Sequence, residues 1–147
     1  MMINTTLDRL VENYQALDSW DDRFAFVISL GKQLPEMAEE LKDEDHRVLG
    51  CMSRVWINME PKFKLEDPLY FLADSDAAIV KGLIAVLMVV FQDKTPVEAL
   101  KVDIDSIFSK LELDQHLSPG RTNGFHSMVK RIKQLCLQRV LQVQKGL

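Results

Sequence analysis

Cysteine is scarce in this chain of 147 residues: Cys51 and Cys136 are the only two, and they form no CxxC pair. This excludes a disulfide-rich secreted scaffold and a cysteine zinc finger, although the count alone leaves one internal disulfide open. Because a domain of this length buries roughly 68–70% of its unfolded surface, it needs neither a disulfide nor a metal ion for stability. We expect residues 1–147 to form a single domain.

Long hydrophobic runs are also missing. The N-terminus has no basic segment followed by an apolar core, so no signal peptide is readable. The most apolar run, Ala77–Phe91, is interrupted by Lys81 and is shorter than the ~20 residues that span a bilayer. The sequence therefore predicts a cytoplasmic protein with reduced thiols and no membrane partner.

The chain lacks an excess of positive charge: its net charge is −4, which argues against a nucleic-acid partner. The charges are unevenly distributed, however. Residues 1–50 contain 11 acidic and 5 basic side chains, whereas residues 115–147 contain 6 basic and no acidic ones. The basic end either marks a partner surface or complements the dipole of a C-terminal helix.

Helical spacing is clear at the N-terminus. A first helix is predicted by the apolar positions Leu7, Leu10, Val11, Tyr14 and Leu17. Asp18 or Ser19 can cap a second helix, which Gly31 and Pro35 should end. Its apolar face should be Trp20, Phe24, Val27 and Ile28.

The middle of the chain is rich in strand-forming residues. We predict a small antiparallel meander with strands at Arg47–Leu49, Arg54–Met59 and Leu69–Ala73. Asp74-Ser75-Asp76 has the composition of an N-cap, and the apolar segment 76–91 should be the buried central helix.

Proline-containing caps predict the later helices. Thr95-Pro96-Val97-Glu98 matches a capping box, and Ser118-Pro119 opens a last helix in the same way. Helices at both ends and strands between them indicate an α+β fold, with a small antiparallel sheet packed against helices.

The two cysteines differ in setting. Cys136 lies on the apolar stripe of the last helix, which favours a packing role. Cys51 follows Gly50 between two predicted strands, so it should lie at a loop tip, near His46, Arg47 and Arg54. A nearby cation lowers the pKa of a thiol and favours the nucleophilic thiolate, although a glycine–cysteine turn can also be purely structural.

A reactive Cys51 has three possible uses. A hydrolase would need a histidine base held by a third group; of the three histidines, His116 is the best placed in sequence. An iron–sulfur cluster typically needs four ligands, which one loop cysteine cannot supply. A sulfur carrier needs only a lone thiol that forms and passes on a persulfide, and the cysteine count favours this use.

Several segments, in order, closely resemble the SufE family of sulfur-acceptor proteins, which includes CsdE. They are LGKQLPEM, GCMSRVW, DSDAAIVKGLIAVL, the Thr95-Pro96 pair and HLSPGRTNGF. The resemblance extends from about Trp20 to about Lys133. The blocks around Cys51 and Ser75–Leu87 are specific, whereas the TP and SP pairs are not. Ser75–Leu87 is more similar to SufE, whereas GKQLP and Arg54-Val55-Trp56 fit either branch.

The resemblance implies a SufE/IscU-like fold and a function. Cys51 matches the family's acceptor cysteine, which takes sulfane sulfur from the persulfide of a pyridoxal-phosphate cysteine desulfurase of the SufS or CsdA type. The acceptor stimulates desulfurase turnover and passes the sulfur to a SufBCD-type iron–sulfur scaffold. The resemblance thus predicts an accessory carrier rather than an enzyme. No cofactor is expected on this chain, because the pyridoxal phosphate should belong to the partner.

The resemblance also suggests roles for neighbours of Cys51. Gly50 would let the loop move the thiol between a sheltered state near an apolar cavity and a presented state. Arg121 matches a family arginine, preceded here by Pro119-Gly120, and would stabilise the thiolate or contact the desulfurase. Asp74 would cap the central helix or belong to the interface.

Two further readings stay open. One is a thiol-dependent hydrolase or reductase, with Cys51 and His116 as the hydrolase pair; Cys136 is poorly placed as the resolving thiol of a reductase. The other is a plain interaction module, in which Cys51 could be replaced by serine without loss.

Overall fold

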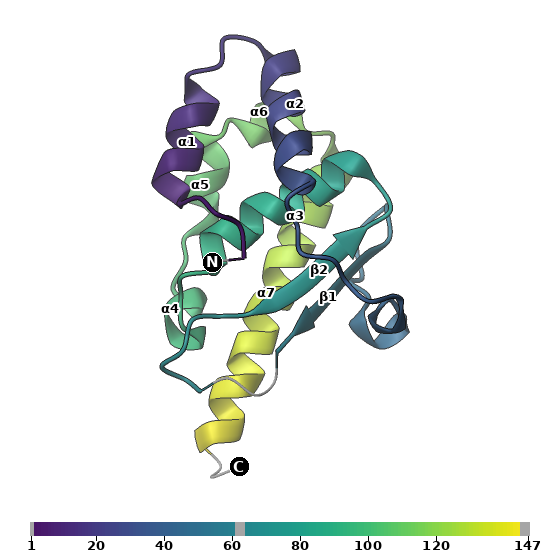
Figure 1. Cartoon of the computed structure of the whole chain (residues 1–147), viewed down its shortest axis with the longest axis vertical. Helices are drawn as coiled ribbons and strands as arrows, with labels where there is room; N and C mark the ends of the chain where they lie inside the picture. The colour runs from purple at the N-terminus through teal and green to yellow at the C-terminus, as the bar shows by residue number, and fades with distance from the viewer. Residues whose placement is uncertain (1, 61–63, 145–147) are drawn as a thin grey trace.

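A computed structural model describes residues 2–60 and 64–144 of the chain. Within them, a two-stranded antiparallel sheet lies along one side of a group of helices, which confirms the predicted α+β class (Figure 1). The elements are α1 (Leu7–Gln15), α2 (Trp20–Gly31), two 3-10 turns η1 (Glu39–Leu41) and η2 (Glu44–His46), β1 (Val55–Met59), β2 (Phe71–Ser75), α3 (Ala78–Phe91), α4 (Pro96–Leu100), α5 (Ile104–Lys110), α6 (Leu113–His116) and α7 (Pro119–Gln144).

The sheet has two strands in the described part of the chain, not the three of the predicted meander. Strands β1 and β2 pair antiparallel, with Val55 opposite Ser75 and Met59 opposite Phe71. The predicted strand Arg47–Leu49 was wrong: it contributes only an isolated bridge between Arg47 and Trp56. The backbone turns away at Gly50, whose φ of +89° is incompatible with a continuing strand.

Strand β2 begins two residues later than predicted. The backbone N–H of Leu69 donates to the carbonyl of Lys94, 2.8 Å away, in the turn after α3. Leu69 is thus held by that turn and not by β1. The ladder starts at Phe71, which is buried against the core.

Helix α3 is the buried centre of the molecule. Eleven of its fourteen residues are buried, as its nearly continuous apolar sequence predicted. The predicted cap at Asp74–Asp76 was wrong, because Ser75 still belongs to β2 and the Asp76 carboxylate binds Arg54. The helix N-cap is Ala77, without a side-chain cap; its N–H donates instead to Ser75 Oγ at 3.3 Å.

Helices α2 and α3 pack closely through two glycines. A Cβ at Gly31 would lie 2.7 Å from the backbone nitrogen of Gly82, and a Cβ at Gly82 would overlap the carbonyl oxygen of Val27. Gly31 is the last residue of α2, and its φ is not positive. Close packing of α2 against α3 therefore explains why residue 31 is a glycine, and the predicted C-cap does not.

Side-chain caps begin the helices largely where the sequence placed them. Ser19 caps α2, and Thr95 and Glu98 form the complete predicted capping box of α4. Ser118 Oγ accepts the N–H of Arg121 at the start of α7. The N-terminal half of α7 buries Phe125, Met128, Val129 and Ile132 in the core and so supports the loop that carries Cys51.

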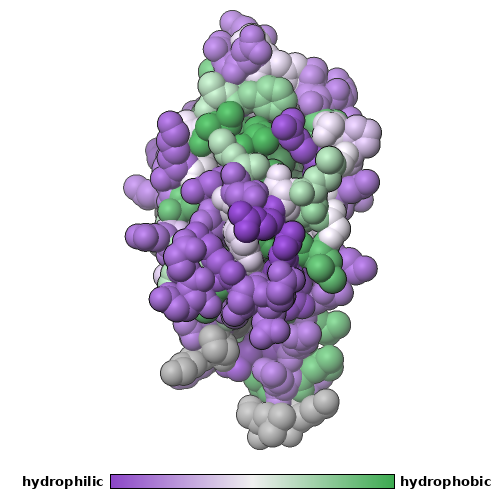
Figure 2. Space-filling view, turned by 90° about the vertical axis from the view of Figure 1, so that its right-hand side faces the viewer, coloured by the Kyte–Doolittle hydropathy of each residue, from purple (hydrophilic) through white to green (hydrophobic). Residues whose placement is uncertain are grey.

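The side of the molecule that carries η1 and η2 is largely hydrophilic across its middle, and hydrophobic residues gather above this zone (Figure 2). This agrees with the charged composition of residues 36–47. None of the helices in the described residues combines the length and hydropathy needed to cross a bilayer.

Candidate functional site

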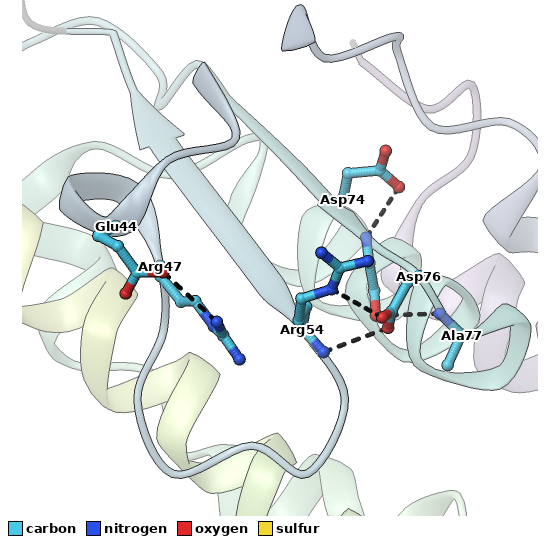
Figure 3. Close-up of polar contacts among 7 residues, drawn as sticks. Glu44, Arg47, Arg54, Asp74, Asp76 and Ala77 are labelled. Carbon is cyan, nitrogen blue, oxygen red and sulfur yellow. Dashed lines mark hydrogen bonds and ion pairs between the residues drawn. The ribbon is translucent and has the colours of Figure 1, made fainter. Parts of the chain in front are cut away.

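The candidate site is the loop 48–53, whose two ends are fixed near the hairpin. At one end, Val48 N–H donates to the Val55 carbonyl at 2.9 Å. At the other, Arg54 donates to both carboxylate oxygens of Asp76, from its backbone N–H at 3.2 Å and from Nε at 3.0 Å. Figure 3 shows Arg47 and Arg54 at the two ends of this loop. We call residues 48–53 the Cys51 loop.

Gly50 is required at the turn of this loop for two reasons. Its φ of +89° lies in the left-handed region, which is costly for residues with a Cβ. A Cβ at position 50 would also lie 2.6 Å from Ser127 Oγ on α7. The glycine therefore lets the Cys51 loop turn sharply while its backbone lies directly on α7.

The thiol of Cys51 is half-buried against α7. Its Sγ lies 3.6 Å from the Gly124 carbonyl oxygen, a weak hydrogen bond. A Cβ at Gly124 would sit 3.5 Å from the sulfur, so the glycine keeps space open beside it. That space is a cavity of about 30 Å³, lined mainly by apolar groups: Cys51, Met52, Ser53, Val80, Leu83, Gly120, Arg121, Gly124, Phe125 and Met128.

Burial raises the pKa of the Cys51 thiol above its ordinary value, and the charge of Arg47 only partly opposes this effect. The docked cysteine is therefore held as the neutral thiol, which is a poor nucleophile. Of the three basic residues near Cys51 in the sequence, His46, Arg47 and Arg54, only the charge of Arg47 affects the pKa of the thiol. His46 is paired with Asp43 and Arg54 with Asp76.

Large apolar side chains next to Cys51 face the solvent. Leu49 is 81% exposed and Met52 is 86% exposed. A Cβ at Gly120 would overlap Met52 Sδ, so Met52 rests on the first turn of α7 at that glycine. An apolar pair flanking a half-buried thiol is typical of a surface that meets another protein.

Comparison with known proteins decides the family. The family model described as "SufE: Fe-S metabolism associated domain" matches residues 8–136, most of the chain. The chain belongs to the SufE family. An uncharacterised SufE-like protein of Rhizobium meliloti is 43% identical over 130 residues, which cover 88% of this chain and 93% of the relative. One of Rhizobium etli is 42% identical over 130 residues, 88% of each chain.

The fold of this SufE-family chain is also found in a solved structure. The solution structure of a hypothetical protein from Thermus thermophilus matches it with a TM-score of 0.73 and covers 92% of this chain and 96% of the other. The two sequences are only 15% identical, so this likeness bears on the fold alone.

Arg121 and Gly50 lie with Cys51, as the family resemblance implied. Arg121 lines the cavity beside the thiol, and its side chain makes no hydrogen bond or ion pair with another residue in the described ranges. The exposed guanidinium of Arg121 is therefore available to contact a partner protein or a negatively charged group that approaches the thiol. It does not contribute to the pKa shift of Cys51 in the docked state.

Asp74 lies apart from the thiol cavity, on β2. Its carboxylate binds Lys42 at 2.8 Å and Lys81 at 3.4 Å and accepts the Ser75 N–H at 2.8 Å. Burial works to raise the pKa of Asp74, but these three partners outweigh it and lower the pKa. The residue thus ties the segment after α2 to β2 and α3, a role that differs from the predicted helix cap.

The histidine that a hydrolase would need is not beside Cys51. The ring of His116 lies 3.6 Å from that of Trp20, centroid to centroid, and His126 packs on Phe108. Neither lines the cavity beside Cys51. The described residues also contain no group of three or more His, Cys, Asp or Glu that could hold a metal ion.

Sequence reasoning missed the contacts that α7 makes with the Cys51 loop. Gly124 and Ser127, spaced by three on one helix face, contact Cys51 and Gly50 respectively. The sequence does contain a pattern that indicates these contacts. Gly120, Gly124 and Ser127 are small residues on one face of α7, where another segment can approach the helix closely. Cys136 is fully buried in the core, as predicted.

Proposed function

We propose that this chain is a sulfur acceptor and carrier for a cysteine desulfurase in iron–sulfur cluster assembly. The observation that carries the proposal is the setting of Cys51. It is a lone thiol at a loop tip, beside a small apolar cavity and between two exposed apolar side chains, in a chain of the SufE family. Sulfur transfer needs one accessible thiol and no histidine base, and this is what the Cys51 loop offers.

The transfer is a thiol–persulfide exchange. Cys51 loses its proton to solvent or to the leaving thiolate, and its sulfur attacks the outer sulfur of the donor's persulfide. A new S–S bond forms on Cys51 as the donor's S–S bond breaks, and the donor cysteine leaves as a thiolate. No external oxidant or reductant is needed, because the sulfane sulfur changes carriers without a net change in oxidation state.

Loop movement would switch the thiol between rest and reaction. In the docked state, burial disfavours the thiolate. Release of the loop from α7 would expose the thiol to water and to the donor and remove that penalty. Gly50, whose φ is positive, would act as the hinge, and the base of the loop would stay anchored through Arg54 and Asp76.

The cavity beside the thiol fits the product. About 30 Å³ exceeds the ~10–15 Å³ that a single water-sized atom occupies, so one additional sulfur can be accommodated on Cys51 after the loop returns. The lining is largely apolar, which would disfavour the entry of water and of charged thiols. A persulfide held there would be protected until the next partner draws the loop out.

The remaining partners follow from the family resemblance. The donor would be a desulfurase of the SufS or CsdA type, which supplies the pyridoxal phosphate, and the recipient a SufBCD-type scaffold. The cluster is then cargo built elsewhere, and this chain acts in the cytoplasm as an accessory carrier rather than as an enzyme in its own right.

Desulfurase kinetics test this function. Alanine production from free cysteine should rise when the chain is added to the desulfurase of the same organism, because the product sulfur is removed. Cys51→Ser should abolish the increase, and Cys136→Ser should retain it because Cys136 is buried in the core. An equal increase with Cys51→Ser would indicate a plain interaction module and overturn the carrier role.

A further inference from the structure

A second hollow, of about 450 Å³, lies beside the Cys51 loop. One wall is Arg47 with the first two residues of the Cys51 loop, Val48 and Leu49, and the other is one face of α7. The helix residues that line it are Ser127, Lys130, Arg131 and Gln134, at spacings of three and four that place them on one face. We call this hollow, lined by these seven residues, the basic groove.

The groove carries positive charge that the protein itself barely neutralises. The side chains of Lys130 and Arg131 make no hydrogen bond or ion pair with another residue in the ranges that the structure describes. Arg47 has one carboxylate partner, Glu44, at 3.5 Å, and the side chain of Glu44 is 84% exposed. Figure 3 shows this pair beside the Cys51 loop. No carboxylate is among the lining residues, so three cations face an open hollow.

This local charge opposes that of the whole molecule. The chain has a net charge of −4, yet residues 115–147 contain six basic and no acidic side chains. A helix C-terminus attracts cations only within its last turn, whereas Lys130 and Arg131 lie in the middle of α7, Pro119–Gln144. The dipole of α7 therefore does not account for these two cations.

The remaining lining favours a polypeptide over a small molecule as the ligand. Leu49, 81% exposed, forms one lip of the groove, and Met52, 86% exposed, lies three residues further along the same loop. Small-ligand pockets are mostly enclosed and apolar, with few charged groups. This hollow instead has long charged side chains and is open to solvent, and its Leu49 belongs to the same loop as Cys51.

We propose that the basic groove binds an acidic segment of the protein that donates sulfur to Cys51, beside the donor's reactive cysteine. The inference rests on the proposed function, since it names how the donor is recognised. Charge pairing at such a rim accelerates encounter and sets orientation. Contact with Leu49 in the Cys51 loop and with Arg47 just before it would couple docking of the donor to movement of the loop.

The test is charge reversal with a matched control. The double variant K130E/R131E lowers the net charge by four, and R9E/K32E on α1 and at the end of α2 does the same. Arg9 and Lys32 are exposed, and their side chains have no hydrogen bond or ion pair with the described residues. Dissociation constants for the desulfurase of the same organism would be measured by calorimetry at several salt concentrations.

We expect K130E/R131E to raise Kd about tenfold or more, because two surface ion pairs with the partner are lost and the reversed charges add repulsion. The affinity of this variant should also vary less with salt than that of the wild type. R9E/K32E should bind as the wild type does. At saturating concentration, K130E/R131E should still receive sulfur on Cys51, because the thiol and its cavity are intact.

A photo-crosslinker in place of Lys130 locates the occupant. We expect it to capture a desulfurase peptide rich in Asp and Glu, and a crosslinker in place of Lys32 to capture none.

Equal Kd values for the two double variants, or capture of a peptide without acidic residues, would overturn the proposal. The proposal would also be overturned if K130E/R131E left Kd unchanged and altered only the KM of the desulfurase reaction for cysteine. That result would indicate that the basic groove binds a small carboxylate. A wild-type chain that binds through the groove yet gains no sulfur would refute the carrier function alone.

Discussion

Replacing Gly50 with alanine should release the Cys51 loop from α7. The native φ of +89° costs an L-residue about 1–2 kcal/mol in the left-handed region. The new Cβ would also lie 2.6 Å from Ser127 Oγ, a contact that rotation of the serine side chain can relieve. The backbone cost therefore dominates, and it is lost when the loop undocks and relaxes.

The size of the effect follows from that cost. A penalty of about 1–2 kcal/mol on the docked state raises the undocked population about 5–30-fold, as long as undocked molecules stay a minority. Because the thiolate forms more readily in water than beside α7, alkylation of Cys51 by iodoacetamide at neutral pH should accelerate by the same factor. The free energy of unfolding should fall by no more than the same amount, since the base of the loop and the core are unchanged.

Peptide mass spectrometry after timed alkylation gives the rate at Cys51 directly. Ser53→Ala, in the same loop, is the matched control and should react as the wild type does. The double variant Gly50→Ala/Ser127→Ala removes the contact with Oγ but not the φ penalty, so most of the acceleration should persist. Wild-type reactivity in Gly50→Ala, or full reversal by Ser127→Ala, would refute the argument from backbone conformation.

Three further outcomes are expected. Arg121→Ala should slow sulfur transfer from the desulfurase while leaving the thermal midpoint unchanged; unaltered transfer would dismiss that role. Gly124→Ala, whose Cβ would lie 3.5 Å from Cys51 Sγ, should leave loading intact but shorten the lifetime of the persulfide in dithiothreitol, because the cavity is filled. Alkylation of Cys51 in the folded chain should rise with pH through a midpoint above the ordinary thiol pKa of about 8.5, since burial raises its pKa. That midpoint should move down in Gly50→Ala. Because the pKa of Cys51 is higher in the fold than in the unfolded chain, the free energy of unfolding is highest below the ordinary thiol pKa. It should fall as the pH rises above that value.

Local signals in the sequence located most of the fold. The helix caps at Ser19, Thr95 and Ser118, and the apolar segment of α3, depend on residues close in sequence and were confirmed. The start of α3 was wrong because Asp76 has a partner, Arg54, twenty-two residues away. No local pattern reports such a long-range pair.

The candidate site was only half visible in the sequence. The Gly50-Cys51 pair indicates a turn with a thiol, but the cavity beside it depends on Gly124, seventy-three residues later. The raised pKa of Cys51 likewise results from burial against α7, whereas its sequence neighbours suggested a thiol activated by cations. Tertiary packing therefore raises the pKa of Cys51, which the neighbouring cations alone would lower.

The role of Gly31 shows the same limit. A glycine before a proline at the end of a helix has the signature of a C-cap, yet this one lets α2 approach Gly82 of α3. A C-cap and a close helix contact both favour a residue without a Cβ. The sequence alone therefore does not distinguish a glycine needed for its backbone conformation from one needed for helix packing.

The most direct test of sulfur transfer to Cys51 is the mass of the Cys51 peptide after the chain is mixed with a cysteine desulfurase and free cysteine. We expect a gain of one sulfur atom on Cys51, absent without the desulfurase and absent in Cys51→Ser, with Cys136 unmodified. A Cys51 that alkylates normally but gains no sulfur from the desulfurase of the same organism would contradict the carrier function.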